Sequence, residues 1–347
     1  MNIAIVEISE SHEECIFSQV SFMKDAGYSV SLIAHPKVIQ QAKSYASYFS
    51  NIIEFDGDVK GIKIRMRKSI QLFNLLKKYD KVMFNTASSS KIIRNAVFLL
   101  NFKKTSCVGV IHDVSKLSSS FTQKVISTKI KKYVALSEDL VAAAKVPSDI
   151  KLASFYPIFF PNQEYEDMKK NKEEIWICIP GRVFFSRRDY RFLIEQLANQ
   201  TGLDNRIKFI ILGNINTTDG IQFKEEINGL NLQNYFVFFE KFIENATYYN
   251  YLKSSDYILP LLNKNDKSYV NQKITGTFNL AYAYKKTMLN DEYYKVIPNL
   301  LAKSYFYTDN SFINVLNSLS DKKGKQYEEE KWTYKFQQQQ YINFLNS

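Results

Sequence analysis

Residues 175–190, IWICIPGRVFFSRRDY, contain the clearest structural signal in the chain. The stretch begins as an unbroken apolar run of strand length and bends at Pro180-Gly181. Such a run predicts a strand that is covered on both faces, as in a parallel sheet. The loop that follows carries three arginines within seven residues, namely Arg182, Arg187 and Arg188. A buried strand that ends in arginines indicates a loop that binds an anion.

The same alternation of apolar runs and helical patterns extends in both directions from this stretch. Toward the C-terminus, further strands are predicted at 207–214, 235–242, 256–262 and 287–290. Toward the N-terminus, strands are predicted at 2–8, 28–35, 81–86, 106–113 and 131–138. Apolar strands separated by helices indicate parallel sheets with helices on both faces. The predicted fold class is therefore α/β, with two Rossmann-like domains.

A change of composition separates the two alternating sets. Residues 154–174 carry two prolines and then a charged polar stretch, which is typical of an interdomain connection. We expect an N-terminal domain at 1–160, a C-terminal domain at 161–325, and a C-terminal helix at 326–347 that returns toward the N-terminal domain. The last segment is rich in aromatic residues, which argues against a disordered tail.

The net charge of +11 favours an anionic partner. Part of it is concentrated in Lys60–Lys81, which holds eight Lys or Arg residues and one acid. This segment predicts a helix whose basic face is either simply solvated or in contact with an anionic membrane surface. Because the basic residues form no recognisable nucleic-acid motif, we expect no nucleic-acid partner.

The chain shows no signal for secretion or for crossing a membrane. Its N-terminus has no basic region before the first apolar run, and no apolar run approaches ~18 residues. The three cysteines are far apart, and Cys107 and Cys178 lie in strand-like runs, which predicts buried free thiols. We expect a protein of the reducing cytoplasm, with peripheral contact at the inner face of the membrane as the alternative.

Four segments resemble, in the same order, the GT-B glycosyltransferases, and in particular the large nucleotide-sugar-dependent family with retaining members. CVGVIHDVSKL (107–117) resembles the strand-end His-Asp motif of its acceptor domain, and KKYVALSEDLVAAA (131–144) resembles the segment that closes this domain. IPGRVFFSRRDY (179–190) resembles the Gly-Arg-x4-Lys segment that opens its donor domain. Residues 235–262 resemble its strand, helix and strand that lead to the donor ribose.

This resemblance covers nearly the whole chain and implies two Rossmann-like domains that face each other across a cleft. It implies transfer of a sugar from a nucleotide diphosphate sugar to a glycan or a lipid-linked glycan, in the synthesis of cell-surface polysaccharide or glycoconjugate. A nucleotide-sugar 2-epimerase of the same fold and a catalytically degenerate scaffold subunit are the alternatives. We expect no cofactor and no metal, since the arginines supply positive charge.

In the resembling family, the arginine of this segment and the basic residue five positions later bind the donor diphosphate. Arg182 and Arg187 occupy these positions, and Gly181 lets the backbone approach the ligand. Fixed cations there stabilise the leaving diphosphate as its negative charge grows. The alternative is that Arg187 or Arg188 pairs with nearby acids, Asp189 or Glu195, on a helix surface. The predicted donor-binding residues are Gly181, Arg182, Arg187, Arg188, Asn214, Glu240, Lys273, Thr275, Gly276, Thr277 and Asn279.

One part of the predicted donor site departs from the family pattern. Thr275-Gly276-Thr277 predicts a helix start with free N–H groups, which suits a phosphate. The family carries two glutamates near this helix, and the matching positions here are Asn271 and Asn279. Asparagine can still bind hydroxyls, but the departure leaves the stereochemical outcome open.

The predicted reacting centre lies at the strand ends of the N-terminal domain. His112 and Asp113 form the polar end of the strand predicted at 106–113, and His12 and Glu13 follow the first strand. A neutral histidine there can contact the sugar or accept a proton from the acceptor hydroxyl. The alternatives are a strand-end histidine satisfied by Asp113 and an acidic helix start at 12–14. We expect acceptor contacts from Ser11, Asn85 and Ser137.

Overall fold

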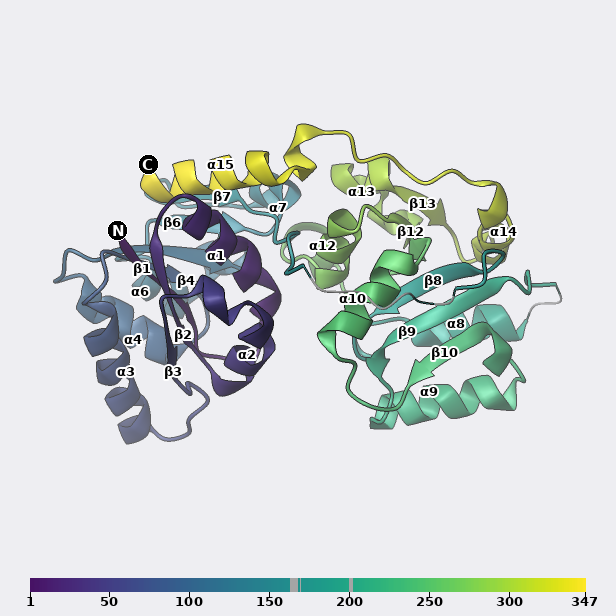
Figure 1. Ribbon diagram of the computed structural model, residues 1–347, viewed down its shortest axis with the longest axis horizontal. Helices are drawn as coiled ribbons and strands as arrows, with labels where there is room; N and C mark the ends of the chain where they lie inside the picture. The colour runs from purple at the N-terminus through teal and green to yellow at the C-terminus, as the bar shows by residue number, and fades with distance from the viewer. Residues whose placement is uncertain (163–167, 169, 200–201) are drawn as a thin grey trace. The chain divides into compact units, whose positions relative to one another are not determined.

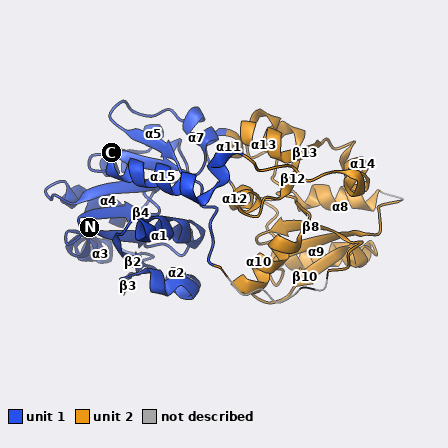
Figure 2. Cartoon of the chain, turned by 45° about the horizontal axis from the view of Figure 1, so that its top comes forward, with its two compact units in different colours: residues 1–161, 271–274, 329–347 blue, residues 162–270, 275–328 orange. Residues whose placement is uncertain are grey.

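The computed structural model describes residues 1–162, 168, 170–199 and 202–347. The chain forms two compact units (Figure 2). Unit 1 comprises residues 1–161, 271–274 and 329–347, and unit 2 comprises 162–270 and 275–328. The sequence places these divisions after residues 160 and 325. Part of the predicted connection at 154–174, and Gln200 at the end of a predicted helix, lie outside the described residues.

Unit 1 contains a seven-stranded parallel sheet in the order β3-β2-β1-β4-β5-β6-β7 (Figure 1). The strands are β1 (Asn2–Glu7), β2 (Ser29–Ala34), β3 (Asn51–Glu54), β4 (Lys81–Phe84), β5 (Ser106–Ile111), β6 (Lys132–Ala135) and β7 (Lys151–Ser154). The α-helices are α1 (Ile16–Asp25), α2 (Pro36–Gln41), α3 (Ile62–Leu76), α4 (Lys91–Leu100), α5 (Lys116–Ser119), α6 (Phe121–Ile126), α7 (Glu138–Ala143) and α15 (Tyr334–Asn346). The 3₁₀ turns are η1 (Glu13–Cys15), η2 (Ala42–Tyr48) and η6 (Glu330–Trp332).

Two hydrophobic cores cover the two faces of this sheet, which explains the unbroken apolar runs. In β1, Ala4 and Val6 belong to the core formed with α3 and α4. Ile3 and Ile5 face the opposite core, formed with α1 and α15. Tyr341 of α15 is buried in that second core, so the aromatic tail packs onto unit 1.

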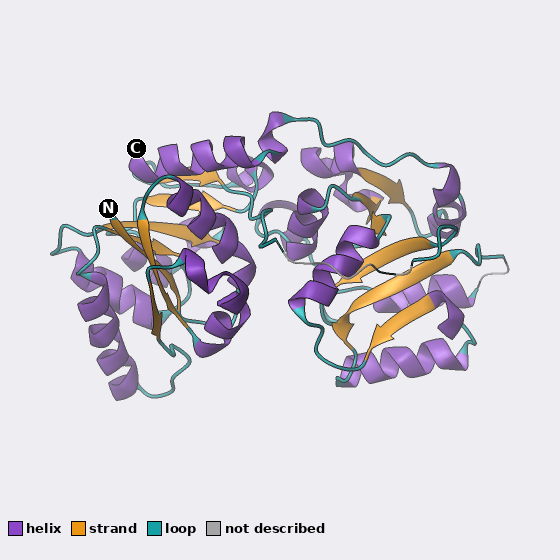
Figure 3. Cartoon of the chain, in the orientation of Figure 1, coloured by secondary structure: helices purple, strands orange, loops and turns teal. Residues whose placement is uncertain are grey.

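Unit 2 contains a six-stranded parallel sheet in the order β10-β9-β8-β11-β12-β13. Figure 3 draws the strands orange and the helices purple. The strands are β8 (Ile175–Pro180), β9 (Ile207–Asn214), β10 (Phe236–Phe239), β11 (Tyr257–Ile258), β12 (Thr287–Asp291) and β13 (Ser304–Tyr307). The α-helices are α8 (Tyr190–Ala198), α9 (Thr218–Gly229), α10 (Asn245–Ser254), α11 (Ser268–Asn271), α12 (Gly276–Ala283), α13 (Pro298–Lys303) and α14 (Phe312–Asn317). The 3₁₀ turns are η3 (Gln233–Tyr235), η4 (Glu292–Val296) and η5 (Leu319–Asp321).

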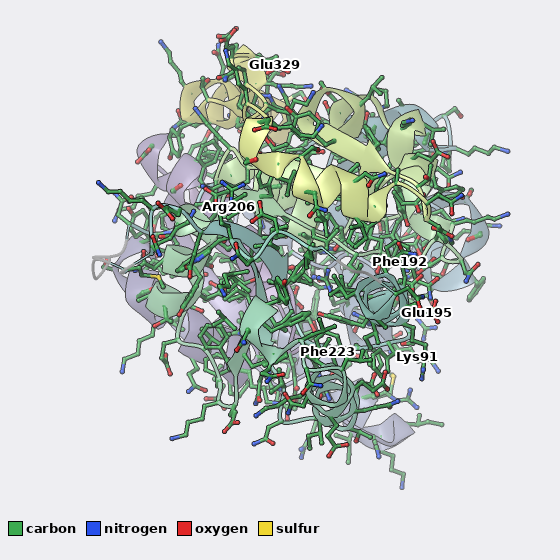
Figure 4. All side chains as sticks on the ribbon, turned by 90° about the vertical axis from the view of Figure 1, so that its right-hand side faces the viewer. Lys91, Phe192, Glu195, Arg206, Phe223 and Glu329 are labelled. Carbon is green, nitrogen blue, oxygen red and sulfur yellow. The ribbon has the colours of Figure 1, made fainter. Side chains whose placement is uncertain are left out.

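Aromatic side chains fill the core between the unit 2 sheet and helices α8 and α9. Phe223 of α9 is fully buried, and its ring lies 4.8 Å from that of Tyr190 at the start of α8. Phe192 of α8, labelled in Figure 4, packs edge-on against Phe312 of α14. These rings hold α8 against β8, and so fix the loop that carries the arginines.

Several predicted elements differ in length from those observed. The strand predicted at 256–262 is only two residues long, because Pro260 offers no N–H and Leu261 has a left-handed φ of 50°. The helix predicted to begin at Ser11 begins instead with η1, after His12 in the left-handed region. The short strands β3, β7 and β13 give too little periodic signal to be recognised in the sequence.

Both sheets reverse their strand order at an internal point, between β1 and β4 in unit 1 and between β8 and β11 in unit 2. In open parallel sheets, ligands bind beyond the carboxyl ends of the strands at such a point. A ligand is therefore expected at one or both of these sheet edges, where the predicted site residues should lie. Within the described residues, no helix combines the length and apolar character needed to span a bilayer.

Candidate functional site

The unit 2 edge presents two arginines that have no carboxylate partner among the described residues. Arg182 and Arg187 lie in the loop after β8, and both side chains are exposed. Asp189 is engaged elsewhere, because its carboxylate caps α8 by accepting from the Phe192 N–H at 3.1 Å. The ion pairs that offered an alternative explanation for Arg187 are therefore not formed, and its charge is available to an anion.

The backbone beneath these arginines requires glycine. Gly181 has a φ of 101°, a conformation that side-chain-bearing residues rarely adopt. A Cβ on Gly213, at the end of β9, would lie 2.4 Å from the Gly181 carbonyl oxygen. The loop after β8 therefore packs directly against the end of β9. This contact fixes the position of the backbone at Arg182.

Arg188 has a different position from the other two arginines. Its half-buried guanidinium donates hydrogen bonds to the carbonyl oxygens of Pro180 and Pro260, and to Thr277 Oγ1 at 2.9 Å. These bonds join the ends of β8 and β11 to the start of α12. The sequence predicts a third donor ligand here, whereas the observed bonds make Arg188 a bridge that positions the edge.

The start of α12 lies at the same edge. Thr275 caps the helix by accepting from the Thr277 N–H, and Gly276 is exposed. Asn279 is buried, and its Oδ1 has no hydrogen-bond partner among the described residues. The amide at the predicted ribose-binding position therefore has an acceptor, one turn inside the helix, that no described residue uses.

The remaining predicted donor residues are less well placed. Asn214 Oδ1 accepts from the Asn216 N–H at 2.7 Å in a local turn. Glu240 is two-thirds exposed and pairs with Lys224 at 2.7 Å, which lowers the pKa of Glu240. Lys273 and Asn271 belong to the four residues grouped with unit 1.

The unit 1 edge is a buried hydrogen-bonded network around Asn85, which directly follows β4. Asn85 Nδ2 donates to Glu7 Oε2 at 2.9 Å and to the His12 carbonyl oxygen at 2.8 Å. Asn85 Oδ1 accepts from Gln19 Nε2 at 2.6 Å, which fixes the orientation of the amide. Asn85, predicted to contact the acceptor, instead holds together the loops that surround the site.

Two histidines stack at this edge. The rings of His12 and His112 are 3.8 Å apart between centroids and inclined by 26°. His112 Nε2 lies 2.8 Å from the Asn85 carbonyl oxygen, which can only accept, so the hydrogen of the neutral ring is on Nε2. His112 Nδ1 then carries a lone pair, and among the described residues no group donates to it. His12 Nδ1 faces Glu14 Oε1 at 3.3 Å, which leaves its Nε2 as the basic atom.

The two histidines differ in their affinity for a proton. Burial lowers the pKa of His112 to about 4, and the charge of His12 acts in the same direction. Burial also opposes a charge on His12, but the hydrogen bond to Glu14 and the charges of Glu14 and Glu7 outweigh it and raise the pKa of His12. At neutral pH, His112 is thus a neutral acceptor, and His12 is the stronger base.

The three carboxylates near the histidines, those of Glu7, Glu13 and Glu14, lie in different environments. Glu7 is buried, and burial raises the pKa of Glu7 although Ser9, Thr86 and Asn85 donate to it. Burial also raises the pKa of Glu13 to about 7, against a hydrogen bond from Tyr45. Of these acids, only Glu13 belongs to the predicted catalytic set. The sequence signal that could have identified Glu7 as a site residue is its place as an acid at the end of the apolar run NIAIVE.

The other predicted residues of unit 1 have structural partners. Asp113 accepts from the N–H and hydroxyl of Ser115 in a local turn, so it does not bond to His112. Ser137 is buried and caps α7 by accepting from the Leu140 N–H at 3.2 Å. Ser11 is exposed beside His12.

A pocket of about 440 Å³ opens at this edge, beyond the ends of β1 and β4. Its lining includes Glu7, Thr86 and the three consecutive serines 88–90 at the start of α4. Hydroxyls and carboxylates on a concave surface are suited to binding a polyhydroxylated ligand.

One group of described residues has the composition of a metal site. Glu10, His35 and Asp58 place donor atoms within 4.8 Å of one another. Asp56 and Asp58 also form an Asp-x-Asp sequence. However, His35 Nδ1 accepts from the Lys37 N–H at 3.2 Å, so its Nε2, which faces the carboxylates, carries the hydrogen. Lys37 also pairs with Glu10, and this arrangement suits a network of ion pairs better than a metal.

Solved structures share this architecture over the whole chain. A glycosyltransferase from Rickettsia africae matches with a TM-score of 0.66 at 16% identity, covering 99% of this chain and 93% of the other. HepE from Anabaena, in complex with UDP, matches with a TM-score of 0.63 at 12% identity, covering 100% and 98%. The fold is GT-B.

The GT-B fold also supports a different chemistry. UDP-GlcNAc 2-epimerase from Methanocaldococcus jannaschii matches with a TM-score of 0.64 at 9% identity, covering 100% of this chain and 99% of the other. No protein-family model and no curated protein matches the sequence. Because one fold supports several chemistries, the residues at the two edges must indicate which one operates here.

Proposed function

We propose that this GT-B protein is a glycosyltransferase that uses a nucleotide diphosphate sugar as donor. The observation that carries the proposal is a pair of exposed arginines, Arg182 and Arg187, at the strand-order reversal of unit 2, neither of which pairs with any acid that the structure describes. The start of α12 lies at the same edge, and its free N–H groups favour phosphate. A diphosphate is the anion that suits this arrangement, as in HepE, which binds UDP.

In this proposal, the arginines act mainly on the transition state. Negative charge accumulates on the diphosphate as the bond to the sugar breaks, so fixed guanidinium groups stabilise the transition state more than the ground state. No metal is required for this step. Activity that survives a chelator supports metal independence, whereas activity lost to the chelator and restored by manganese contradicts it.

We assign acceptor activation to unit 1. His12 is the proposed base, and Glu14 holds its ring so that Nε2 can accept the proton of the acceptor hydroxyl. His112 remains neutral, and its Nδ1 lone pair accepts a hydrogen bond from a sugar hydroxyl. The acceptor is a glycan or a lipid-linked glycan bound in the pocket beside Glu7 and Thr86.

We also propose peripheral contact with an anionic membrane at its cytoplasmic face. The α3 residues Lys63 and Arg67 are exposed beside Ile70, which is 49% exposed, and α3 contains no acid. Basic and apolar side chains on one helix face are typical of interfacial helices. Binding to phosphatidylglycerol vesicles that is lost in Lys63→Glu/Arg67→Glu supports this contact, and equal binding to neutral vesicles contradicts it.

One observation favours epimerisation as the second candidate. Glu7, Glu13 and Glu14 bring three carboxylates to the unit 1 edge, and an epimerase needs acids around the sugar. The deciding experiment incubates the protein with a panel of nucleotide sugars and separates the products. Slow release of free nucleotide indicates transfer to water and supports a glycosyltransferase, whereas an isomeric nucleotide sugar indicates an epimerase. Stabilisation by UDP or GDP without any turnover indicates a scaffold.

A further inference from the structure

Two pockets on unit 1 meet at the same pair of cationic residues. The polar pocket beside Glu7 extends to Arg65 on α3 and Lys91 at the start of α4. A second pocket, of about 230 Å³, lies between α3 and α4 and is lined by Arg65, Lys91, Arg94, Asn95, Ile62 and Met66. Because Arg65 and Lys91 line both pockets, the two pockets adjoin each other and form one groove.

Within the described part of the chain, the cations at the junction have no carboxylate partners. Arg65 Nε donates to the Gly61 carbonyl oxygen at 3.2 Å, and Arg94 donates to Asn95 Oδ1. No described acid lies within ion-pair distance of Arg65, Lys91 or Arg94. The acids of the groove, Glu7 and Asp58, line the polar pocket alone. An anion would therefore sit at the junction, away from these acids.

The pocket between α3 and α4 also presents two exposed apolar side chains beside its cations. Ile62 is 74% exposed and Met66 is 50% exposed, and both line the pocket between α3 and α4. The two residues are four positions apart, so their side chains lie on the same face of α3. Exposed apolar side chains beside unpaired cations match a ligand that has an aliphatic chain attached to an anionic group.

We propose that this groove binds an acceptor in which a saccharide is joined through phosphate to an aliphatic chain. The saccharide lies in the polar pocket, the phosphate meets Arg65 and Lys91, and the chain lies along Ile62 and Met66. This inference rests on the proposed glycosyltransferase function and specifies its acceptor class. Each part of such a molecule meets a surface of matching chemistry in the observed order.

The experiment titrates the full-length protein with decyl phosphate, below its micelle-forming concentration, by calorimetry. Inorganic phosphate and decyl maltoside are the comparison probes, since each lacks one part of the recognised unit. We expect saturable binding of decyl phosphate that is at least about tenfold tighter than that of either comparison probe. Equal affinity for inorganic phosphate would overturn the role of the chain, and equal affinity for decyl maltoside would overturn the role of the phosphate.

Matched variants on one helix locate the site. Arg65→Ala and Met66→Ser should each weaken decyl phosphate binding by about tenfold. Lys68→Ala and Ile64→Ser are the controls, because both residues lie on α3 and line neither pocket, Lys68 is half-buried like Arg65, and Ile64 is 45% exposed against 50% for Met66. If all four variants bind alike, decyl phosphate adsorbs to the general surface and the groove proposal fails. Absence of saturable binding also overturns it.

This proposal and the proposed function can fail separately. UDP binding is measured on the same samples and depends on Arg182 in unit 2, which the groove variants leave unchanged. If decyl phosphate binds with the expected variant pattern but UDP does not bind, the groove proposal holds and the proposed donor site is wrong. UDP binding without decyl phosphate binding rejects the groove and retains the glycosyltransferase.

Discussion

The two sheet edges share a topology but differ in their chemistry. At the unit 2 edge, Arg182 and Arg187 are exposed and pair with no acid among residues 1–162, 168, 170–199 and 202–347, and the fixed elements beneath them are backbone and Arg188. At the unit 1 edge, Glu7, Asn85 and His112 are linked by hydrogen bonds, and Glu7 and Asn85 are buried. The unit 2 edge offers positive charge to a ligand. At the unit 1 edge, the hydrogen bonds set the protonation states of its own side chains. The comparison supports the proposal that the unit 2 edge stabilises a leaving group and the unit 1 edge transfers a proton.

The largest expected effect tests the arginines of the unit 2 edge. Arg182→Ala should lower kcat for transfer by about 10²–10³-fold, because it removes a charge that acts on the transition state. Arg206→Ala is the matched control, since Arg206 is an exposed arginine of unit 2 that already pairs with Asp204 at 2.7 Å. The rates are measured with saturating nucleotide sugar. Equal rates in the two variants would remove the distinction between paired and unpaired arginines.

The second prediction tests the proposed base at the unit 1 edge. His12→Ala should lower kcat by about 10²-fold, the usual contribution of a general base. In the unmodified protein, activity should fall as the pH drops through the raised pKa of His12, because the base must be unprotonated. Glu14→Gln removes the group that raises this pKa, so the acidic limb of the kcat profile should move to lower pH. An unmoved limb would show that His12 is not the base.

The third prediction concerns the stability of the same edge. Burial raises the pKa of Glu13 from 4.5 to about 7, so its ionisation opposes folding. The stabilising contribution is present below about pH 4.5 and is lost as the pH rises through about 7. Glu13→Gln should therefore be more stable than the unmodified protein at about pH 8, by about 1–3 kcal/mol.

Urea unfolding at several pH values measures this difference, which should vanish near pH 4 because the carboxyl is then neutral in both states. A difference that stays constant with pH would place the Glu13 carboxylate in contact with water. The acidic limb of the kcat profile should remain in place in this variant, in contrast to Glu14→Gln.

The smallest expected effect tests how the C-terminal helix supports the unit 1 edge. Tyr341 donates to Gln19 Oε1 at 3.1 Å, and Gln19 in turn donates to Asn85. Tyr341→Phe should cost about 1–2 kcal/mol of unfolding free energy, because it leaves a buried acceptor unpaired. Tyr334→Phe, on the same helix, should cost less, since its hydroxyl bonds to the exposed Asp25. Equal losses would show that the connection to Asn85 contributes nothing specific.

Much of the fold could be predicted from the sequence, because its signals are local. The apolar runs that became β1, β4, β5, β8 and β9 are long enough to be recognised, and the helices between them imply parallel pairing. The site was predicted less completely. His12 and His112 were identified as candidates, but their stacking, the role of Glu14 and the buried Glu7 were not predicted.

The sequence by itself determined two Rossmann-like sheets and a cluster of arginines after a buried strand, since both depend on neighbouring residues along the chain. Only the tertiary structure decided which of those arginines is free. Arg188 is occupied because Pro260 and Thr277, 72 and 89 residues away, reach its guanidinium, whereas Arg187 meets no acid. His112 bonds to Asn85 rather than to the adjacent Asp113 for the same reason. Hydrogen bonds select partners by distance and direction in space, and strand order brings distant residues to one edge.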